Sequence, residues 1–126
     1  MRAAELQPEH PAVLLARGRL AAAKENYLEA RALLERSRAK GEESATVYSE
    51  LGAVYMHLKA WDKAAENYEQ ALRMRRRRND LRLSLARTYA QLGRKREAER
   101  KYREVLAFAP DETDAVKGLQ ELGKRF

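Results

Sequence analysis

Cysteine is absent from the 126 residues of this chain, and proline (3) and glycine (6) are scarce. Without cysteine the chain has no disulfide, no thiolate metal site and no cysteine nucleophile. It also has no apolar run of about 18 residues and no charged segment leading into an apolar one. We therefore expect neither a membrane span nor a signal peptide, and the cytoplasm is the favoured location.

Residues typical of catalytic sites are equally few. The only histidines are His10 and His57, and there is no glycine-rich phosphate loop and no histidine-carboxylate cluster with metal-ligand spacing. The acidic pairs at 42–43 and 111–112 lie where helices are expected to start, and there the helix dipole favours negative charge. We therefore expect a protein that is not an enzyme and has no catalytic residue, cofactor or metal site.

The composition that remains is typical of a helical domain. Hydrophobic residues make up 44% of the chain and charged residues 36%, which is too apolar for a disordered tail. Apolar residues recur at steps of three and four, and one helical stripe comprises Val47, Tyr48, Leu51, Val54, Tyr55 and Leu58. The pattern predicts short helices joined by short loops, and hence antiparallel neighbours.

These helices repeat with a period of about 34 residues. A shift by one period aligns Gly18 with Gly52, Tyr55 with Tyr89, Tyr68 with Tyr102, and Ala30 with Ala64 and Ala98. Pro8 and Pro110 also lie three such periods apart, each just before an expected first helix. A plain helical bundle has no reason to keep this register, so the period indicates an array of repeats.

The repeating residues resemble those of the tetratricopeptide repeat, a helix-turn-helix unit of about 34 residues. The unit counted from Ala45 matches best, through Tyr48, Leu51, Gly52, Tyr55, Ala64, Tyr68 and Ala71. The unit counted from Asn79 matches through Leu85, Ala86, Tyr89, Leu92, Gly93, Ala98, Tyr102 and Pro110, with Arg82 where a large apolar residue is usual. The unit counted from Pro11 is the loosest, with Arg17 in place of leucine and Ala21 in place of tyrosine.

This resemblance implies an all-α fold, a right-handed α-solenoid of stacked antiparallel helix-turn-helix hairpins. We expect one domain over residues 1–126, with repeats at about 11–44, 45–78 and 79–112, a partial repeat or turn at 1–10 and a capping helix at 113–126. One hairpin cannot bury its own apolar face, so the units must stack. The short segment before the first unit is typical of a piece cut from a longer array.

The resemblance also implies where a partner would bind. In this family the first helices of successive repeats line a concave groove that holds a peptide or a partner's helix. Carried over residue by residue, the groove comprises Leu15, Arg19, Thr46, Ser49, Ala53, Met56, His57, Leu83, Arg87, Ala90 and Gln91. The alternative is that these side chains are solvated or cover a neighbouring helix.

Family members that grip the C-terminal carboxylate of chaperones carry lysines, arginines and asparagines at defined groove positions. The matching positions here hold Leu15, Arg19, Glu50, Asp80 and Ser84. Only Arg19 has a suitable charge, so we do not expect chaperone-tail binding.

Two functions from different classes follow. The first is a protein-protein interaction scaffold that binds a peptide or helix of a partner in the groove, with self-association through the terminal repeats left open. The second is binding of nucleic acid or another polyanion through residues 73–103, where thirteen basic and three acidic side chains give a local net charge of +10. Nucleic acid is the less favoured partner because the aromatic residues of this region occupy packing positions rather than an open stacking platform.

A basic patch ends the second helix of the middle unit: Arg73, Arg75, Arg76, Arg77 and Arg78. Arg76 occupies the repeat position of Pro8 and Pro110. Without that proline we expect the helix to run on to Asn79 and Asp80, about one turn further than its counterparts, and one of those two side chains to cap the next helix. The patch is most simply a charged helix end stabilised by the helix dipole, and contact with an acidic partner is the alternative.

Overall fold

A computed structural model describes residues 7–125, and these residues form seven α-helices and no β-strand. The helices are α1 (Pro11–Ala23), α2 (Tyr27–Ala39), α3 (Ala45–His57), α4 (Trp61–Met74), α5 (Asn79–Gln91), α6 (Lys95–Phe108) and α7 (Thr113–Arg125). The starts of α1, α3, α5 and α7 are evenly spaced, at the period found in the sequence. The chain is thus an all-α solenoid, which confirms the fold expected from the sequence.

The first helices of the first two hairpins begin at recognisable caps. His10 accepts a hydrogen bond from the backbone N–H of Ala12 through Nδ1 (3.1 Å), and Pro11 occupies the first helical position. Ser44 accepts one from the N–H of Val47 through Oγ (3.3 Å). Both side chains satisfy N–H groups that have no partner within the helix.

The turn inside each hairpin has the same geometry in all three. Glu25, Lys59 and Gly93 have positive φ angles of 63°, 61° and 77°. The next residue donates a backbone hydrogen bond of 2.9 Å to a carbonyl five residues earlier, as from Ala60 to Tyr55. This is the left-handed helix ending in which glycine is preferred. It reverses the chain within three residues and makes the two helices antiparallel.

The two helices of a hairpin approach closely where the first carries a small residue. A Cβ atom on Gly18 would lie 2.7 Å from Cγ of Leu34, and one on Gly52 would lie 2.8 Å from the ring of Tyr68. Ala86 holds the same repeat position and is fully buried. In the first two hairpins the first helix therefore fits a large side chain of its second helix into the space that a glycine leaves.

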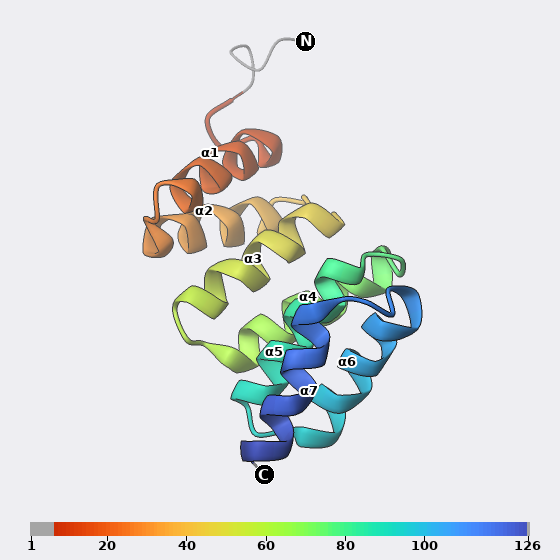
Figure 1. The fold of residues 1–126 in the computed structure, drawn as a ribbon. Coiled ribbons are helices and arrows are strands. Elements are labelled where there is room, and N and C mark those ends of the chain that lie inside the picture. The colour runs from red at the N-terminus through yellow and green to blue at the C-terminus, as the bar shows by residue number, and fades with distance from the viewer. Residues whose placement is uncertain (1–6, 126) are drawn as a thin grey trace.

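Neighbouring hairpins stack through their helices in order. The second helix of each hairpin packs against the next first helix, and the first helices also touch, α1 with α3 and α5 with α7. Figure 1 shows the resulting array, with α1 at one end and α7 at the other. Hydrogen bonds of 2.5 Å from the Tyr55 hydroxyl to Glu35 and from the Tyr89 hydroxyl to Glu69 join successive hairpins.

The expected extension of the helix at the arginine stretch was wrong. The helix α4 ends at Met74, the repeat position of Phe108 at the end of α6. A turn follows, in which the N–H of Arg78 donates to the carbonyl of Arg75 (3.2 Å). Five arginines within six positions repel one another along a helix, and the buried Arg82 side chain donates to the Arg76 carbonyl, so the chain turns here without proline.

The expected cap of α5 was also wrong. The helix begins at Asn79 itself and has no side-chain cap. Asn79 instead donates through Nδ2 to the carbonyl of Val105 in α6 (3.2 Å). The side chain thus joins the two helices of a hairpin and leaves the N-terminus of α5 uncapped.

Candidate functional site

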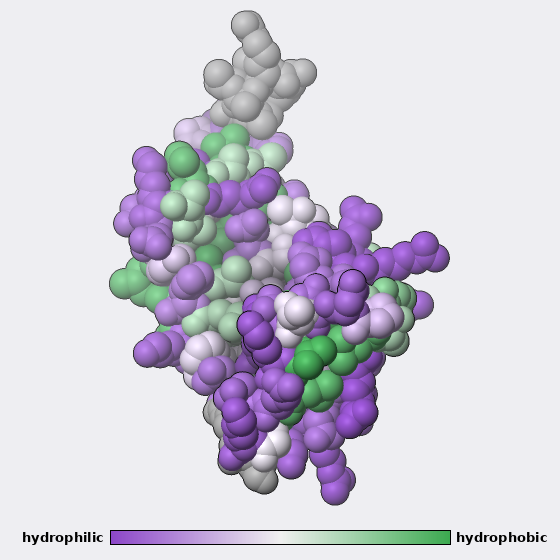
Figure 2. Space-filling model, in the orientation of Figure 1, coloured by the Kyte–Doolittle hydropathy of each residue, from purple (hydrophilic) through white to green (hydrophobic). Residues whose placement is uncertain are grey.

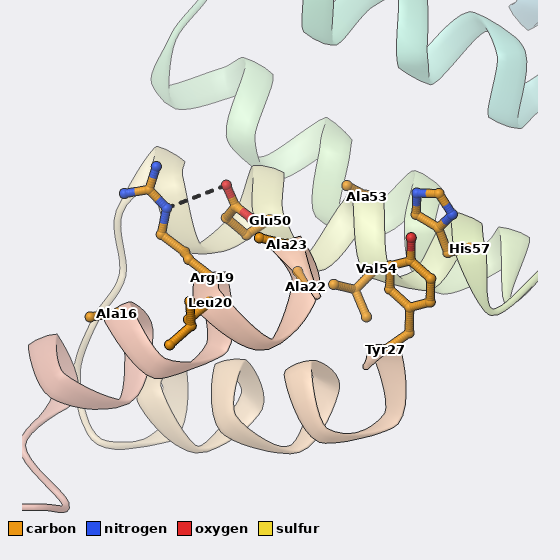
Figure 3. A pocket seen from close by; sticks show the side chains of 10 residues that line it. All are labelled: Ala16, Arg19, Leu20, Ala22, Ala23, Tyr27, Glu50, Ala53, Val54 and His57. Atoms are coloured by element: carbon orange, nitrogen blue, oxygen red, sulfur yellow. Dashed lines mark ion pairs between the residues drawn. The ribbon is translucent and has the colours of Figure 1, made fainter. Parts of the chain in front are cut away.

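A hollow of about 660 Å³ lies between the first two hairpins on the side of the first helices. Its lining comes from α1, from the start of α2 and from the last turns of α3: Ala16, Arg19, Leu20, Ala22, Ala23, Tyr27, Glu50, Ala53, Val54 and His57 (Figure 3). Four of these residues are alanines, whose short side chains leave the space open. We call this site the α1–α3 hollow.

Two polar pairs bound the α1–α3 hollow. Nε of Arg19 lies 3.6 Å from a carboxylate oxygen of Glu50, so this ion pair joins α1 to α3 (Figure 3). The rings of Tyr27 and His57 stack with centroids 4.2 Å apart and planes 6° from parallel. Between the two pairs the wall is apolar, so the hollow combines an apolar centre with polar ends, as ligand sites commonly do.

A second hollow of about 280 Å³ lies at the other end of the array, and we call it the α5–α7 hollow. It is lined by Arg87, Ala90, Gln91, Tyr102, Asp114, Lys117, Gly118, Glu121 and Leu122. Among these residues, Arg87 has its guanidinium 3.4 Å from a carboxylate oxygen of Asp114. This arrangement repeats the motif of the first hollow, because an arginine of one first helix is paired with a carboxylate of the next.

The structure brings six of the expected groove residues to these two hollows. Arg19, Ala53 and His57 line the first, and Arg87, Ala90 and Gln91 line the second. Five others line neither: Leu15, Thr46, Ser49, Met56 and Leu83. Of these, Leu15, Met56 and Leu83 pack partly against the core, while the Ser49 hydroxyl donates to the Thr46 carbonyl (3.0 Å).

Sequence reasoning missed several lining residues. Tyr27 belongs to a second helix, and Asp114 and Lys117 belong to α7, which was expected only to cap the array. A signal for Tyr27 was present, because Trp61 holds the same position one repeat later and marks it as aromatic. No comparable signal identified Glu50 as the partner of Arg19.

The basic patch lies outside both hollows. Arg78 donates to the two carboxylate oxygens of Asp80 (2.8 and 2.7 Å), and this hydrogen bonding lowers the pKa of the Asp80 carboxyl group. Arg73 donates to Gln70 (3.0 Å) and lines, with Arg76, a further hollow between α4, α5 and α6. The patch is therefore on a different part of the surface from the expected groove.

Large hydrophobic side chains are seldom exposed among the described residues. The exposed ones are Leu20, Leu28, Met74, Phe108 and Val116. The face drawn in Figure 2 is mostly hydrophilic and also carries some areas of hydrophobic colour.

Residues 7–125 contain no group of three or more histidine, aspartate or glutamate side chains that could hold a metal ion. In the same part of the chain, no helix combines the length and apolarity that crossing a membrane requires.

Solved structures similar to this chain are tetratricopeptide repeat proteins of low sequence identity. YrrB, a protein with an unusual peptide-binding site, superposes with a TM-score of 0.89 at 22% identity over 94% of this chain and 61% of its own. MamA gives 0.86 at 18% identity over 93% of this chain and 64% of its own. This chain therefore spans less than two thirds of either protein.

The first such domain of Spaghetti (RPAP3), bound to an HSP90 peptide, gives a TM-score of 0.82 at 18% identity, over 95% of both chains. A comparison with curated proteins found no match. The family model described as tetratricopeptide repeat matches residues 9–77 and 43–111. These two overlapping matches cover most of the sequence, and the chain belongs to the tetratricopeptide repeat family.

Proposed function

We propose that this chain is a protein-interaction scaffold, and that a partner protein supplies an extended or helical segment to the face formed by α1, α3, α5 and α7. The α1–α3 hollow carries this proposal. Its volume of about 660 Å³ is in the range of ligand sites in general, and its alanine lining leaves room for side chains of the segment. The peptide bound to the RPAP3 domain supports the same use of the fold.

The two ion pairs indicate which segment fits. Arg19 and Arg87 are the cations among the expected groove residues, and each already faces a carboxylate, Glu50 or Asp114. A carboxylate on the ligand would have to displace that partner, whereas an apolar side chain can enter the space beside the alanines. The preferred ligand therefore presents apolar side chains to the hollows, with polar groups toward the Tyr27–His57 stack.

A matched pair of substitutions tests this assignment. Peptides are first selected by display against the full chain, and their affinity is then measured for two variants. Ala53→Arg fills the α1–α3 hollow, and Ala107→Arg adds the same side chain at an exposed position of α6. Overfilling of a packed contact costs about 1 to 3 kcal/mol, so we expect Ala53→Arg to weaken binding roughly tenfold or more. Met56→Glu and Arg87→Glu extend the test along the face.

The binding test has one control variant and one check of folding. Ala107→Arg must bind the selected peptides as the unmodified chain does, and circular dichroism must show the same helix content in all variants. If the peptides bind Ala53→Arg, Met56→Glu and Arg87→Glu with unchanged affinity, then the face of the first helices is not the binding site.

A further inference from the structure

The three loops that join one hairpin to the next alternate in charge. Residues 41–44 contain Glu42 and Glu43, residues 75–78 are all arginine, and residues 109–112 contain Asp111 and Glu112. The loops are one repeat period apart and follow the equivalent helices α2, α4 and α6. They therefore lie along one edge of the array, with a basic loop between two acidic ones.

Three arginines of the basic loop are free to bind a partner. The side chains of Arg75, Arg76 and Arg77 are exposed. Arg78 is paired with Asp80, but none of these three forms an ion pair with another residue of the range 7–125. Three exposed cations without an ion-pair partner attract an anionic segment of another protein.

Exposed apolar side chains lie beside these arginines. Met74 and Phe108 end α4 and α6 at the same repeat position, and are 43% and 62% exposed. The guanidinium of Arg82 lies 4.5 Å from the centre of the Phe108 ring and donates to the Arg76 carbonyl. Arg82 is itself buried, so it fixes the loop and the ring as one surface.

We propose that this surface, made of Met74, Arg75, Arg76, Arg77 and Phe108, docks an acidic segment of a partner protein that carries an apolar side chain. The planar guanidinium groups match carboxylates in pairs of hydrogen bonds. The exposed ring and the exposed thioether each offer apolar contact next to the arginines. We call it the arginine surface, and none of its residues lines the α1–α3 or the α5–α7 hollow.

The neighbouring charges favour a short acidic peptide over a nucleic acid. A nucleic acid strand carries a phosphate at every nucleotide, and its continuation in either direction along this edge meets an acidic loop. Asp80 and Glu104 add carboxylates close to the arginines, through their ion pairs with Arg78 and Arg82. A short segment places its negative charge over one loop alone.

Fluorescence anisotropy with a defined probe tests the arginine surface. The probe is a labelled peptide with glutamates on both sides of one leucine, measured at low salt against the full chain. The triple variant Arg75→Gln, Arg76→Gln, Arg77→Gln is compared with the matched variant Arg96→Gln, Arg100→Gln, Arg103→Gln, which removes the same charge from exposed positions of α6. Exposed ion pairs are individually weak, so we expect the first triple variant to lose about tenfold in affinity and the second to lose little.

Two further measurements examine the apolar contact. Phe108→Ala should weaken binding about fivefold, because an aromatic side chain is a large part of the contact area. Serine in place of the probe's leucine should weaken it to a similar extent. Circular dichroism and thermal unfolding of each variant confirm that the fold is retained.

Four results would overturn the proposal. The first is that the probe does not bind, and the second is that the two triple variants lose affinity equally. The third is that a single-stranded oligonucleotide binds more tightly than the probe and depends equally on Arg75 to Arg77. The fourth is that light scattering shows dimers of the unmodified chain and monomers of the first triple variant. The third result would assign the surface to nucleic acid. The fourth would assign it to an acidic loop of a second copy.

Discussion

At the scale of single residues, the three hairpin turns share one backbone conformation but have different residues at its left-handed position. Glu25, Lys59 and Gly93 hold equivalent left-handed positions, and only the last is glycine. A residue with a Cβ atom is disfavoured in this conformation by about 1 kcal/mol. The first two hairpins therefore tolerate a strain that the third avoids.

Substitution of Gly93 measures this strain directly. A Cβ atom at Gly93 would have no atom within 4 Å, so Gly93→Ala changes the backbone preference alone. We expect Gly93→Ala to lower the free energy of unfolding by about 1 kcal/mol. Denaturant unfolding followed by circular dichroism gives the value.

The control is Lys59→Ala, which places alanine at the equivalent left-handed position. Lysine is already disfavoured in this conformation, so the substitution leaves the backbone preference nearly unchanged. It should change the free energy of unfolding by less than about 0.5 kcal/mol. Equal losses in the two variants would show that the left-handed conformation is not the cause.

At the scale of helices, the hairpin depends on one close contact. The ring of Tyr68 lies over Gly52 and is only 4% exposed, so the ring has no free space into which it could move. In the first hairpin Leu34 lies over Gly18. The small residue thus sets how closely the first and second helices approach.

Adding one methyl group tests this contact. Gly52→Ala places a Cβ atom 2.8 Å from two ring carbons of Tyr68, and we expect it to lower the free energy of unfolding by about 1 to 3 kcal/mol. Gly123→Ala makes the same change in α7, where a Cβ atom would meet nothing within 4 Å, and should raise it by about 0.5 to 1 kcal/mol. If denaturant unfolding shows no loss for Gly52→Ala, the close approach of α3 and α4 is wrong.

At the scale of the whole molecule, tyrosines hold the stack together. Tyr55 and Tyr89 each donate a hydrogen bond from one hairpin to a glutamate of the hairpin before it. Burial, together with these hydrogen bonds, raises the pKa of Tyr55 to about 12 and also raises the pKa of Tyr89. Burial likewise raises the pKa of Tyr68 to about 12.

The raised pKa values make the fold sensitive to alkali. The folded state favours the neutral phenols, so their contribution to stability is complete below the ordinary pKa of 10.0 and is lost as the pH rises through about 12. We expect the free energy of unfolding to fall steeply over this interval. Denaturant unfolding at a series of pH values, with tyrosinate absorbance recorded, checks the prediction.

Replacement of one tyrosine separates this effect from other alkaline effects. Tyr68→Phe removes one of the titrating groups and should make the decline with pH less steep. Ionisation of all the tyrosines of the folded chain near pH 10.0, the ordinary value, would contradict the assignment.

Much of the fold was predictable because it depends on local and repeated features. The spacing of apolar residues indicated the helices, and the regular period of the sequence indicated that hairpins stack. The expectations that were wrong concern the end of α4 and the cap of α5. Both depend on contacts with other elements: the Arg82 side chain of α5 donates to the Arg76 carbonyl, and the Asn79 side chain donates to the backbone carbonyl of Val105 in α6.

The site was less predictable than the fold. The periodic pattern identified which helices form the face, and Arg19, Ala53 and His57 do line the α1–α3 hollow. The sequence did not indicate that Tyr27 of a second helix stacks on His57, or that Glu50 pairs with Arg19. These contacts join residues about one repeat apart, and no local pattern encodes them.

The sequence by itself thus determined the helices, their repeating register and the small residues at which they pack, because helix formation and close packing act on neighbouring residues and recur in each unit. Only the tertiary structure decided which charges are paired. Arg19 and Arg87 have carboxylate partners on the next hairpin or on α7, whereas Arg75, Arg76 and Arg77 have none within the described chain. The reason is that the field at a charged group depends on distances through space, and those distances are fixed only when the hairpins stack.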